Sequence, residues 1–161
     1  MITTSHPVKD AGGQAHSADQ LDAAALALLS YDVAMLDATA PARPTPCAGW
    51  DVADLLRHMN APHEAFAAGV IGTAEPAVAD PRRQFELSAA RWTLAMSSGA
   101  DQVRVPGVGH PVGTQQVRAV HFIDMLVHRW DLAAALARAV QTDPAIVDAA
   151  LPIAEFRKRT R

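Results

Sequence analysis

Two short polar motifs contain the residues of this chain that are best suited to chemistry. One is the run Asp51-Val-Ala-Asp-Leu-Leu-Arg-His58, and the other joins Asp124 to His128. Residues four apart on a helix lie one turn apart and point the same way, so a carboxylate oxygen and an imidazole nitrogen could reach one small cation. His58 on another helix could supply a third ligand. An open fourth position would then make the metal available for catalysis.

The helix expected to carry Asp124 and His128 has a narrow polar stripe. At 100° per residue, four polar residues fall within a sector of about 80°, and large apolar side chains occupy most of the remainder. The four are His121, Asp124, His128 and Asp131. Two interpretations stay open: the stripe faces water, or it faces a cavity in which charged groups need a partner such as a metal.

Start and stop signals predict an all-α chain. Ser17 and Gln20 form the pattern of a capping box, Asp80 before Pro81 is a second helix start, and Pro62 should end a helix because it lacks an N–H. The predicted helices are 17–40, 51–60, 80–99, 114–139 and 143–150. Helices of these lengths with longer connections are typical of a four-helix bundle, here with a short additional helix.

Two segments are expected to lie outside the helical pattern. Residues 1–16 show no hydrophobic periodicity and are predicted to be a flexible leader, so the bundle domain spans 17–161. Residues 103–113 contain too many Gly and Pro for a helix. They predict a short hairpin or irregular insertion before the fourth helix.

Composition narrows the range of partners. The net charge of −3, from 14 basic and 17 acidic residues, provides no basic stripe for nucleic acid. No signal peptide and no run of about 18 apolar residues is present, which argues against a membrane partner. The single cysteine, Cys47, excludes an internal disulfide framework and favours a cytoplasmic location.

The two polar motifs also carry a family resemblance. Pro44-Thr-Pro-Cys-Ala-Gly-Trp-Asp51 leading to His58, and Asp124-Met-Leu-Val-His-Arg-Trp-Asp-Leu-Ala133, resemble the DinB-like superfamily, in its branch related to the N-terminal domain of mycothiol-dependent maleylpyruvate isomerase. The resemblance covers roughly residues 17–150. It implies a DinB-like four-helix bundle and an inward-facing polar stripe. It also implies a divalent metal, zinc first and nickel or another metal second, held by His58, Asp124 and His128.

The resemblance further suggests roles for neighbouring residues. Asp124 stands where the maleylpyruvate isomerases have Glu, a departure that favours harder metal ions and lengthens the distance to be reached. His121 could be a fourth ligand, a hydrogen-bond donor to a ligand, or a general base, and Asp131 could orient an imidazole. Trp50 and Trp130 are expected to be core residues between the metal-bearing helices.

The function implied by the resemblance is a metal-dependent enzyme that acts on a small organic molecule, as a transferase or isomerase using mycothiol or a similar thiol. Two alternatives remain open. The chain could be a non-catalytic metal-binding or dimerisation module. It could also be a metal-free isomerase or cyclase that uses His58, His121 and Asp124 as acid and base. The family resemblance also implies that the protein forms a homodimer.

Overall fold

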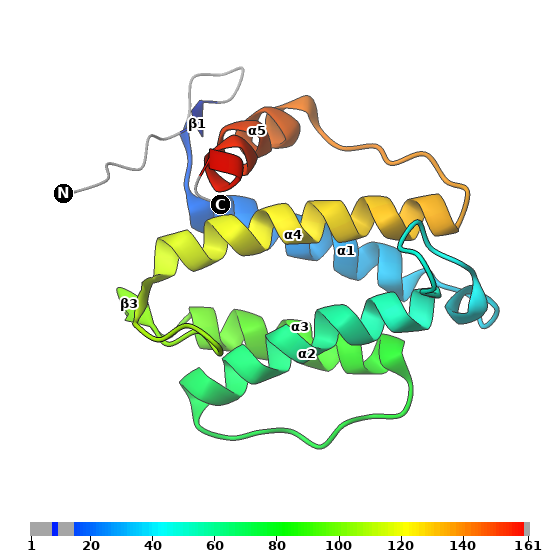
Figure 1. Ribbon diagram of the computed structural model, residues 1–161, viewed down its shortest axis with the longest axis horizontal. Helices are drawn as coiled ribbons and strands as arrows, with labels where there is room; N and C mark the ends of the chain where they lie inside the picture. Colours follow the sequence, from blue (N-terminus) through cyan, green and yellow to red (C-terminus); the bar gives the residue numbers. More distant parts are fainter. Residues whose placement is uncertain (1–7, 10–14, 160–161) are drawn as a thin grey trace.

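The computed structural model describes residues 8–9 and 15–159 and confirms the all-α fold class (Figure 1). The helices are α1 (Ala18–Ala34), the 3₁₀ helix η1 (Ala40–Ala42), α2 (Val52–Ile71), α3 (Pro81–Met96), α4 (Thr114–Ala135) and α5 (Pro144–Arg159). The strands are β1 (Val8–Lys9), β2 (Ala15–His16), β3 (Gln102–Val103) and β4 (Val112–Gly113). All described strands are two residues long, so the helices provide most of the core.

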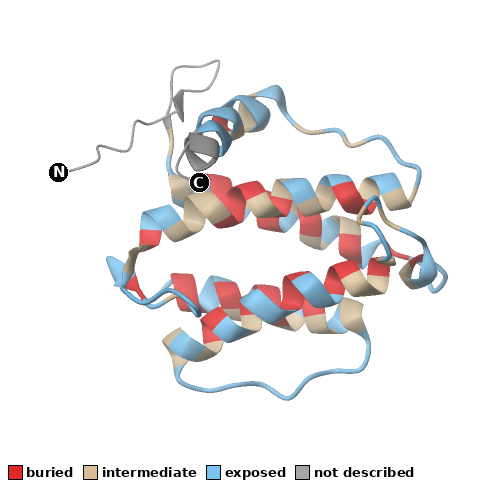
Figure 2. Cartoon of the chain, viewed as in Figure 1, coloured by how far each residue is buried: buried red, intermediate tan, exposed pale blue. Residues whose placement is uncertain are grey.

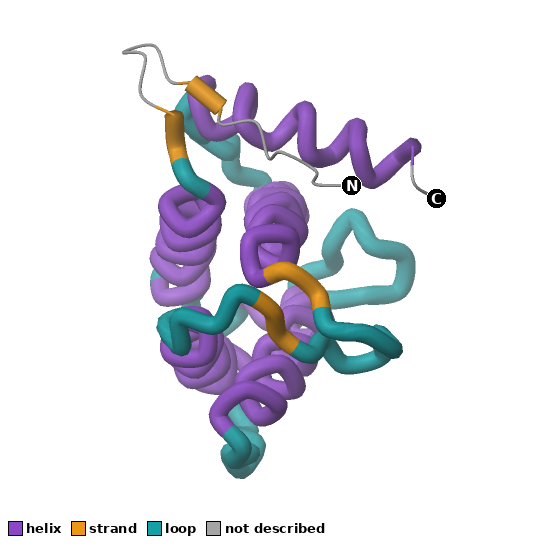
Figure 3. Tube along the Cα trace, turned by 90° about the vertical axis from the view of Figure 1, so that its left-hand side faces the viewer, coloured by secondary structure: helices purple, strands orange, loops and turns teal. Residues whose placement is uncertain are grey.

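The four long helices α1 to α4 form two side-by-side pairs. α1 packs along α4, and α2 packs along α3. The colours of Figure 1 show that α1 and α4 run in one direction and that α2 and α3 run in the opposite direction. The connection 72–80 therefore returns along the outside of the bundle, while α5 lies across the α1 and α4 side (Figures 1 and 3).

The hydrophobic core lies between the two helix pairs. Figure 2 shows buried positions on the facing sides of the helices. Leu29 of α1, Leu55 of α2, Phe85 of α3 and Phe122 of α4 are all fully buried. One large side chain from each helix therefore fixes the spacing of the bundle, and the polar groups of the site are held against this core.

Side-chain caps set the starts of the helices, as predicted. Ser17 and Gln20 form the expected capping box, with bonds of 3.3 and 2.9 Å. Asp51 and Asp54 form another at the start of α2, where the Asp51 carboxylate accepts from the Asp54 N–H at 2.8 Å. Asp80 caps α3 ahead of Pro81. Because these caps satisfy free N–H groups, they fix where the site-bearing helices begin.

Several predicted helix ends were wrong. α1 ends at Ala34 and α4 at Ala135, each a few residues before its predicted end, whereas α2 continues through Pro62 and α5 through Pro152. Pro62 cannot donate to the carbonyl of His58, which costs α2 one helical bond. The buried residues His63, Phe66 and Ala67 just beyond it keep this segment packed as helix.

The predicted hairpin before the fourth helix is confirmed, since β3 and β4 pair in antiparallel fashion with Val103 opposite Val112. In the predicted leader, β1 pairs with β2, while residues 1–7 and 10–14 lie outside the described residues. Within the described part of the chain, no helix is both long and apolar enough to cross a membrane.

The two tryptophans of the motifs do not share one environment. Trp130 was predicted to be a core residue, but 56% of its surface is exposed, so that prediction was wrong. Trp50 is half-buried, and its ring lies 4.9 Å from that of His58. The turn before α2 thus supports the His58 imidazole through an aromatic contact.

Candidate functional site

A cavity of about 870 Å³ opens between α2, α4 and the hairpin segment 105–113. Four of the five predicted site residues line it, namely His58, His121, Asp124 and His128. The inward interpretation of the polar stripe therefore holds for three consecutive members of the α4 stripe, and the solvent-facing interpretation was wrong. This volume is typical of a site for a small organic ligand.

His58 and His128 approach each other across this cavity. Their ring centres are 5.3 Å apart, although one lies on α2 and the other on α4. Two imidazoles bound tetrahedrally to one Zn²⁺ at about 2.0–2.1 Å have ring centres roughly 5 Å apart. The separation of His58 and His128 fits a shared metal ion.

His128 is partly withdrawn from solvent. Burial lowers its pKa, and the neighbouring His58 lowers it further, against opposing effects of the Asp124 carbonyl and carboxylate and of Asp131. Its Nδ1 is buried and has no hydrogen-bond partner of normal geometry among the described residues. A neutral imidazole is the form that binds metals.

The three proposed ligands do not stand together as a metal site among the described residues. Asp124 lines the same cavity as His58 and His128. Among the described residues, however, no three His, Cys, Asp or Glu side chains stand in the arrangement that would hold a metal ion. The donor types and the histidine pair therefore fit a metal, but the complete set of three is not assembled.

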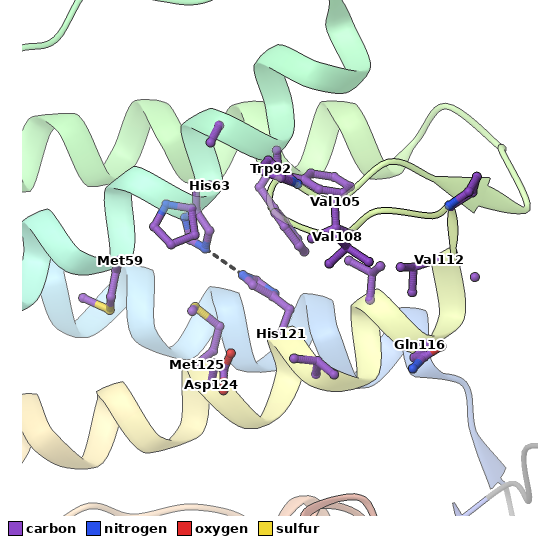
Figure 4. Close-up of a pocket in the computed structure, with 18 of the residues that line it drawn as sticks. Met59, His63, Trp92, Val105, Val108, Val112, Gln116, His121, Asp124 and Met125 are labelled. Atoms are coloured by element: carbon purple, nitrogen blue, oxygen red, sulfur yellow. Dashed lines mark hydrogen bonds between the residues drawn. The ribbon is translucent and has the colours of Figure 1, made fainter. Parts of the chain in front are cut away.

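A second polar group, the buried histidine chain, is formed by Asp22, His121 and His63. Nδ1 of His121 bonds the Asp22 carboxylate, and Nε2 of His121 lies 2.7 Å from Nε2 of His63. Figure 4 shows the His63 and His121 side chains directed at one another from α2 and α4. The three residues are 3%, 6% and 1% exposed, so this chain lies within the core.

Trp92 completes the surroundings of His121. Its ring stacks on the imidazole with a centre-to-centre distance of 3.8 Å and an interplanar angle of 21°. Its indole N–H also donates to Asp22 at 3.3 Å. Asp22 thus receives bonds from His121 and Trp92, and Arg118 lies 3.9 Å away. Both ring nitrogens of His121 are occupied by protein partners, so metal binding by His121 would require one of these bonds to break.

The environment of His63 keeps it neutral. Burial lowers its pKa to about 3, with additional contributions from His121 and His128. Its Nδ1 is buried without a hydrogen-bond partner among the residues that the structure describes. When the Asp22 carboxylate accepts the Nδ1 proton of His121, neutral His63 donates its Nε2 proton to Nε2 of His121, which leaves Nδ1 of His63 unprotonated.

Asp131 is placed differently from the other predicted residues. It is 8% exposed and does not line the cavity. Burial raises its pKa, whereas His128 acts in the opposite direction. Asp131 thus acts electrostatically on His128, and its predicted role in orienting an imidazole stays a prediction.

Sequence reasoning missed Asp22 and Trp92 and gave His63 no role. Asp22 did carry a signal, because it lies beside Leu21 and is followed by Leu26 and Leu29, all three of which are buried. A carboxylate inside an apolar helical stripe needs a buried partner. The partner itself could not be found from the sequence, because His121 lies 99 positions away.

Comparison with known proteins gave a match, which covers the part of the chain that contains α1 and α2. Residues 18–91 match the family model described as the mycothiol maleylpyruvate isomerase N-terminal domain. The match includes Asp22, His58 and His63 and ends before Asp124 and His128. No curated protein and no solved structure gave a significant match to the chain. Over residues 18–91 this chain is thus similar to the mycothiol maleylpyruvate isomerase N-terminal domain, which confirms the predicted resemblance for that part of the chain.

Proposed function

We propose that this protein is a metal-dependent enzyme for a small organic substrate, a transferase or isomerase that uses a mycothiol-type thiol. The observation that carries the proposal is the pair His58 and His128, with ring centres 5.3 Å apart in a cavity of about 870 Å³ that Asp124 also lines. The family relation over residues 18–91 supports the choice of a thiol.

His58, Asp124 and His128 would hold the ion, with zinc as the first choice because two imidazoles and one carboxylate suit it. When bound, such an ion lowers the pKa of a thiol or water next to it, which makes a nucleophile available near neutral pH. His58 is exposed, while His128 is half-buried, so the proposed ligands can be reached from solvent.

The residues of the cavity wall would position the substrate. Met59, Phe66 and Met125 are buried apolar residues that line it, and the hairpin segment covers one side. These groups exclude water from the reacting atoms, which strengthens electrostatic interactions there. His121 would act as acid or base only through the Nε2 atom that it shares with His63.

A second candidate is a metal-free isomerase or cyclase that uses the same cavity. The buried histidine chain favours it, because a carboxylate, an imidazole and a second imidazole in hydrogen-bond contact are the parts of an acid–base system. The metal-binding module without catalysis is less favoured. A metal that only links helices requires no cavity of this size.

Metal analysis separates these candidates. Protein purified without chelator should contain close to one equivalent of metal, and both His58→Ala and His128→Ala should lose it. A metal-free wild type that also fails to take up Zn²⁺ would leave acid–base catalysis as the proposed function.

We also propose that the protein is a homodimer. Val127 and Trp130 lie one turn apart on α4 and are 52% and 56% exposed, so they present adjacent apolar surface. Light scattering on wild type and Trp130→Glu tests this, with a dimer expected for the wild type and a monomer for the variant. A monomeric wild type at high protein concentration would contradict it.

A further inference from the structure

We infer that the protein walls of the cavity favour an uncharged, largely apolar organic molecule and disfavour a carboxylate or sulfonate on any part of a ligand that does not bind the metal directly. This inference deepens the proposed function and rests on it for the identity of the site. It concerns the substrate and not the metal.

The first observation is the charge of the lining. Among the described residues, no Arg or Lys lines the cavity. The polar lining consists of histidines, Gln116 and the carboxylic acid Asp124. Burial holds the pKa of His63 at about 3, so this residue provides no positive charge near neutral pH. An anion entering the cavity would lose water and find no Arg or Lys in the described lining to pair with.

The second observation is that Arg57 and Arg118, which lie near lining residues in the sequence, are paired with other groups of the protein. Arg57, next to His58 in the chain, pairs with Asp54 at 2.7 Å. Arg118 on α4 binds Asp19 at 2.9 Å and the carbonyl of Met96 at 2.8 Å. Recruitment of either guanidinium to a ligand would break these contacts. Arg104 precedes the lining residue Val105, but it is exposed and is not part of the lining.

The third observation is the apolar wall. The Trp92 and Phe66 rings pack at a tilt of 42° with centres 4.6 Å apart, and Figure 4 places Val105 and Val108 of the hairpin segment beside Trp92, with Val112 farther along. Aromatic and branched aliphatic walls favour a ligand with flat or branched hydrocarbon parts. The lining histidines and Gln116 then provide hydrogen bonds that orient an uncharged polar group, such as a carbonyl or a hydroxyl.

The experiment compares two dyes that differ by one charge. N-Phenyl-1-naphthylamine is uncharged, and 8-anilino-1-naphthalenesulfonate has the same ring system with a sulfonate group. Both are titrated by fluorescence into the protein after chelator treatment. We expect the uncharged dye to bind the metal-free protein at least about tenfold more tightly than the sulfonate, because an unpaired buried charge is strongly disfavoured.

Two variants locate the binding and test its cause. Ala65 is exposed and lines the cavity, so Ala65→Trp should fill the entrance without disturbing the core and should weaken binding of the uncharged dye. Gln116, also exposed in the lining, allows Gln116→Arg to add the missing cation, which should strengthen sulfonate binding severalfold. Circular dichroism of each variant confirms that the helices are retained.

Equal or tighter binding of the sulfonate to metal-free wild type would overturn the inference, as would uncharged-dye binding that Ala65→Trp leaves unchanged. A sulfonate affinity that Gln116→Arg leaves unchanged would overturn the assigned cause. Because these titrations use metal-free protein, they are independent of metal content. Failure of the metal proposal is therefore distinguishable from failure of this one.

Discussion

The carboxylate of Asp22 on α1 bonds Nδ1 of His121 on α4 across the core of the bundle. The two residues are 99 positions apart in the chain, and both are more than nine-tenths buried. Trp92 of α3 and His63 of α2 bond the same pair, so one polar chain joins all four helices of the bundle. This chain fixes the position of the α4 turn that precedes Asp124.

Replacing Asp22 with Ala should destabilise the protein substantially. The variant leaves the His121 and Trp92 donors buried without their acceptor, and breaking a buried polar pair typically costs about 3–5 kcal/mol. Urea unfolding followed by circular dichroism measures the loss. Asp19→Ala is the matched control, because Asp19 is exposed and pairs with the same Arg118. Its cost should stay below about 1 kcal/mol. Equal losses for both variants would contradict the role assigned to Asp22.

Stability should fall in acid because of His63. Its folded-state pKa of about 3 lies below the unfolded value of about 6.5, so the unfolded state binds the additional proton between these pH values. The stabilisation is complete above pH 6.5 and decreases as the pH falls toward 3. We expect the free energy of unfolding of metal-free protein to be about 2 kcal/mol lower at pH 5 than at pH 7.5 from this residue.

In the His63→Phe variant, the free energy of unfolding should decrease about 2 kcal/mol less between pH 7.5 and pH 5 than in the wild type, whatever the absolute stability of the variant. His110→Gln serves as the control because His110 is exposed on the hairpin segment, and it should keep the wild-type pH dependence. The measurement is urea unfolding at a series of pH values. A His63→Phe protein with the same slope as wild type would place the titrating group elsewhere.

The cap of α2 should contribute measurably to stability and to the position of His58. Asp51→Ala removes the acceptor for the Asp54 N–H, a bond of 2.8 Å, and should cost about 1 kcal/mol. Asp51→Asn keeps a capping acceptor and should cost only a few tenths of a kcal/mol. Thermal unfolding of the two variants compares them. An equal loss in both would show that charge, and not capping, is the source of the effect.

The length of the side chain at position 124 should control metal affinity. Asp124 lines the cavity with the two histidines, but the three donors are not assembled as a metal site. Asp124→Glu adds one methylene and should tighten Zn²⁺ binding about tenfold, which corresponds to about 1.4 kcal/mol. Asp124→Ala should weaken it by at least as much. Competition with a chromophoric chelator measures both, and weaker binding by the Glu variant would contradict the prediction.

Local rules predicted much of the fold. The starts at Ser17, Asp51 and Asp80 depend on caps that the sequence encodes within three residues, and the structure confirms them. The predicted end of α2 at residue 60 was wrong because tertiary packing of Phe66 and Ala67 outweighs the local cost of Pro62 in a helix. The exposure of Trp130 was also missed, since its motif does not reveal which side of α4 is covered.

The candidate site was partly predictable for a similar reason. The spacing of Asp124 and His128 places them on one face of a helix, and the family resemblance supported His58 as the third candidate ligand. The buried histidine chain depends on contacts between residues 58 and 99 positions apart, which no local pattern encodes. Periodicity also could not distinguish a polar stripe facing water from one facing a cavity. The cavity itself settles that orientation.

Metal content tests the central claim most directly. Elemental analysis should be made on wild type, His58→Ala, His128→Ala and the control His110→Gln, all purified without chelator or added metal. The proposed site predicts about one equivalent of a divalent metal in the wild type and in His110→Gln, and almost none in the other two. A wild type without metal that cannot be reconstituted, or ligand variants that retain a full equivalent, would contradict it.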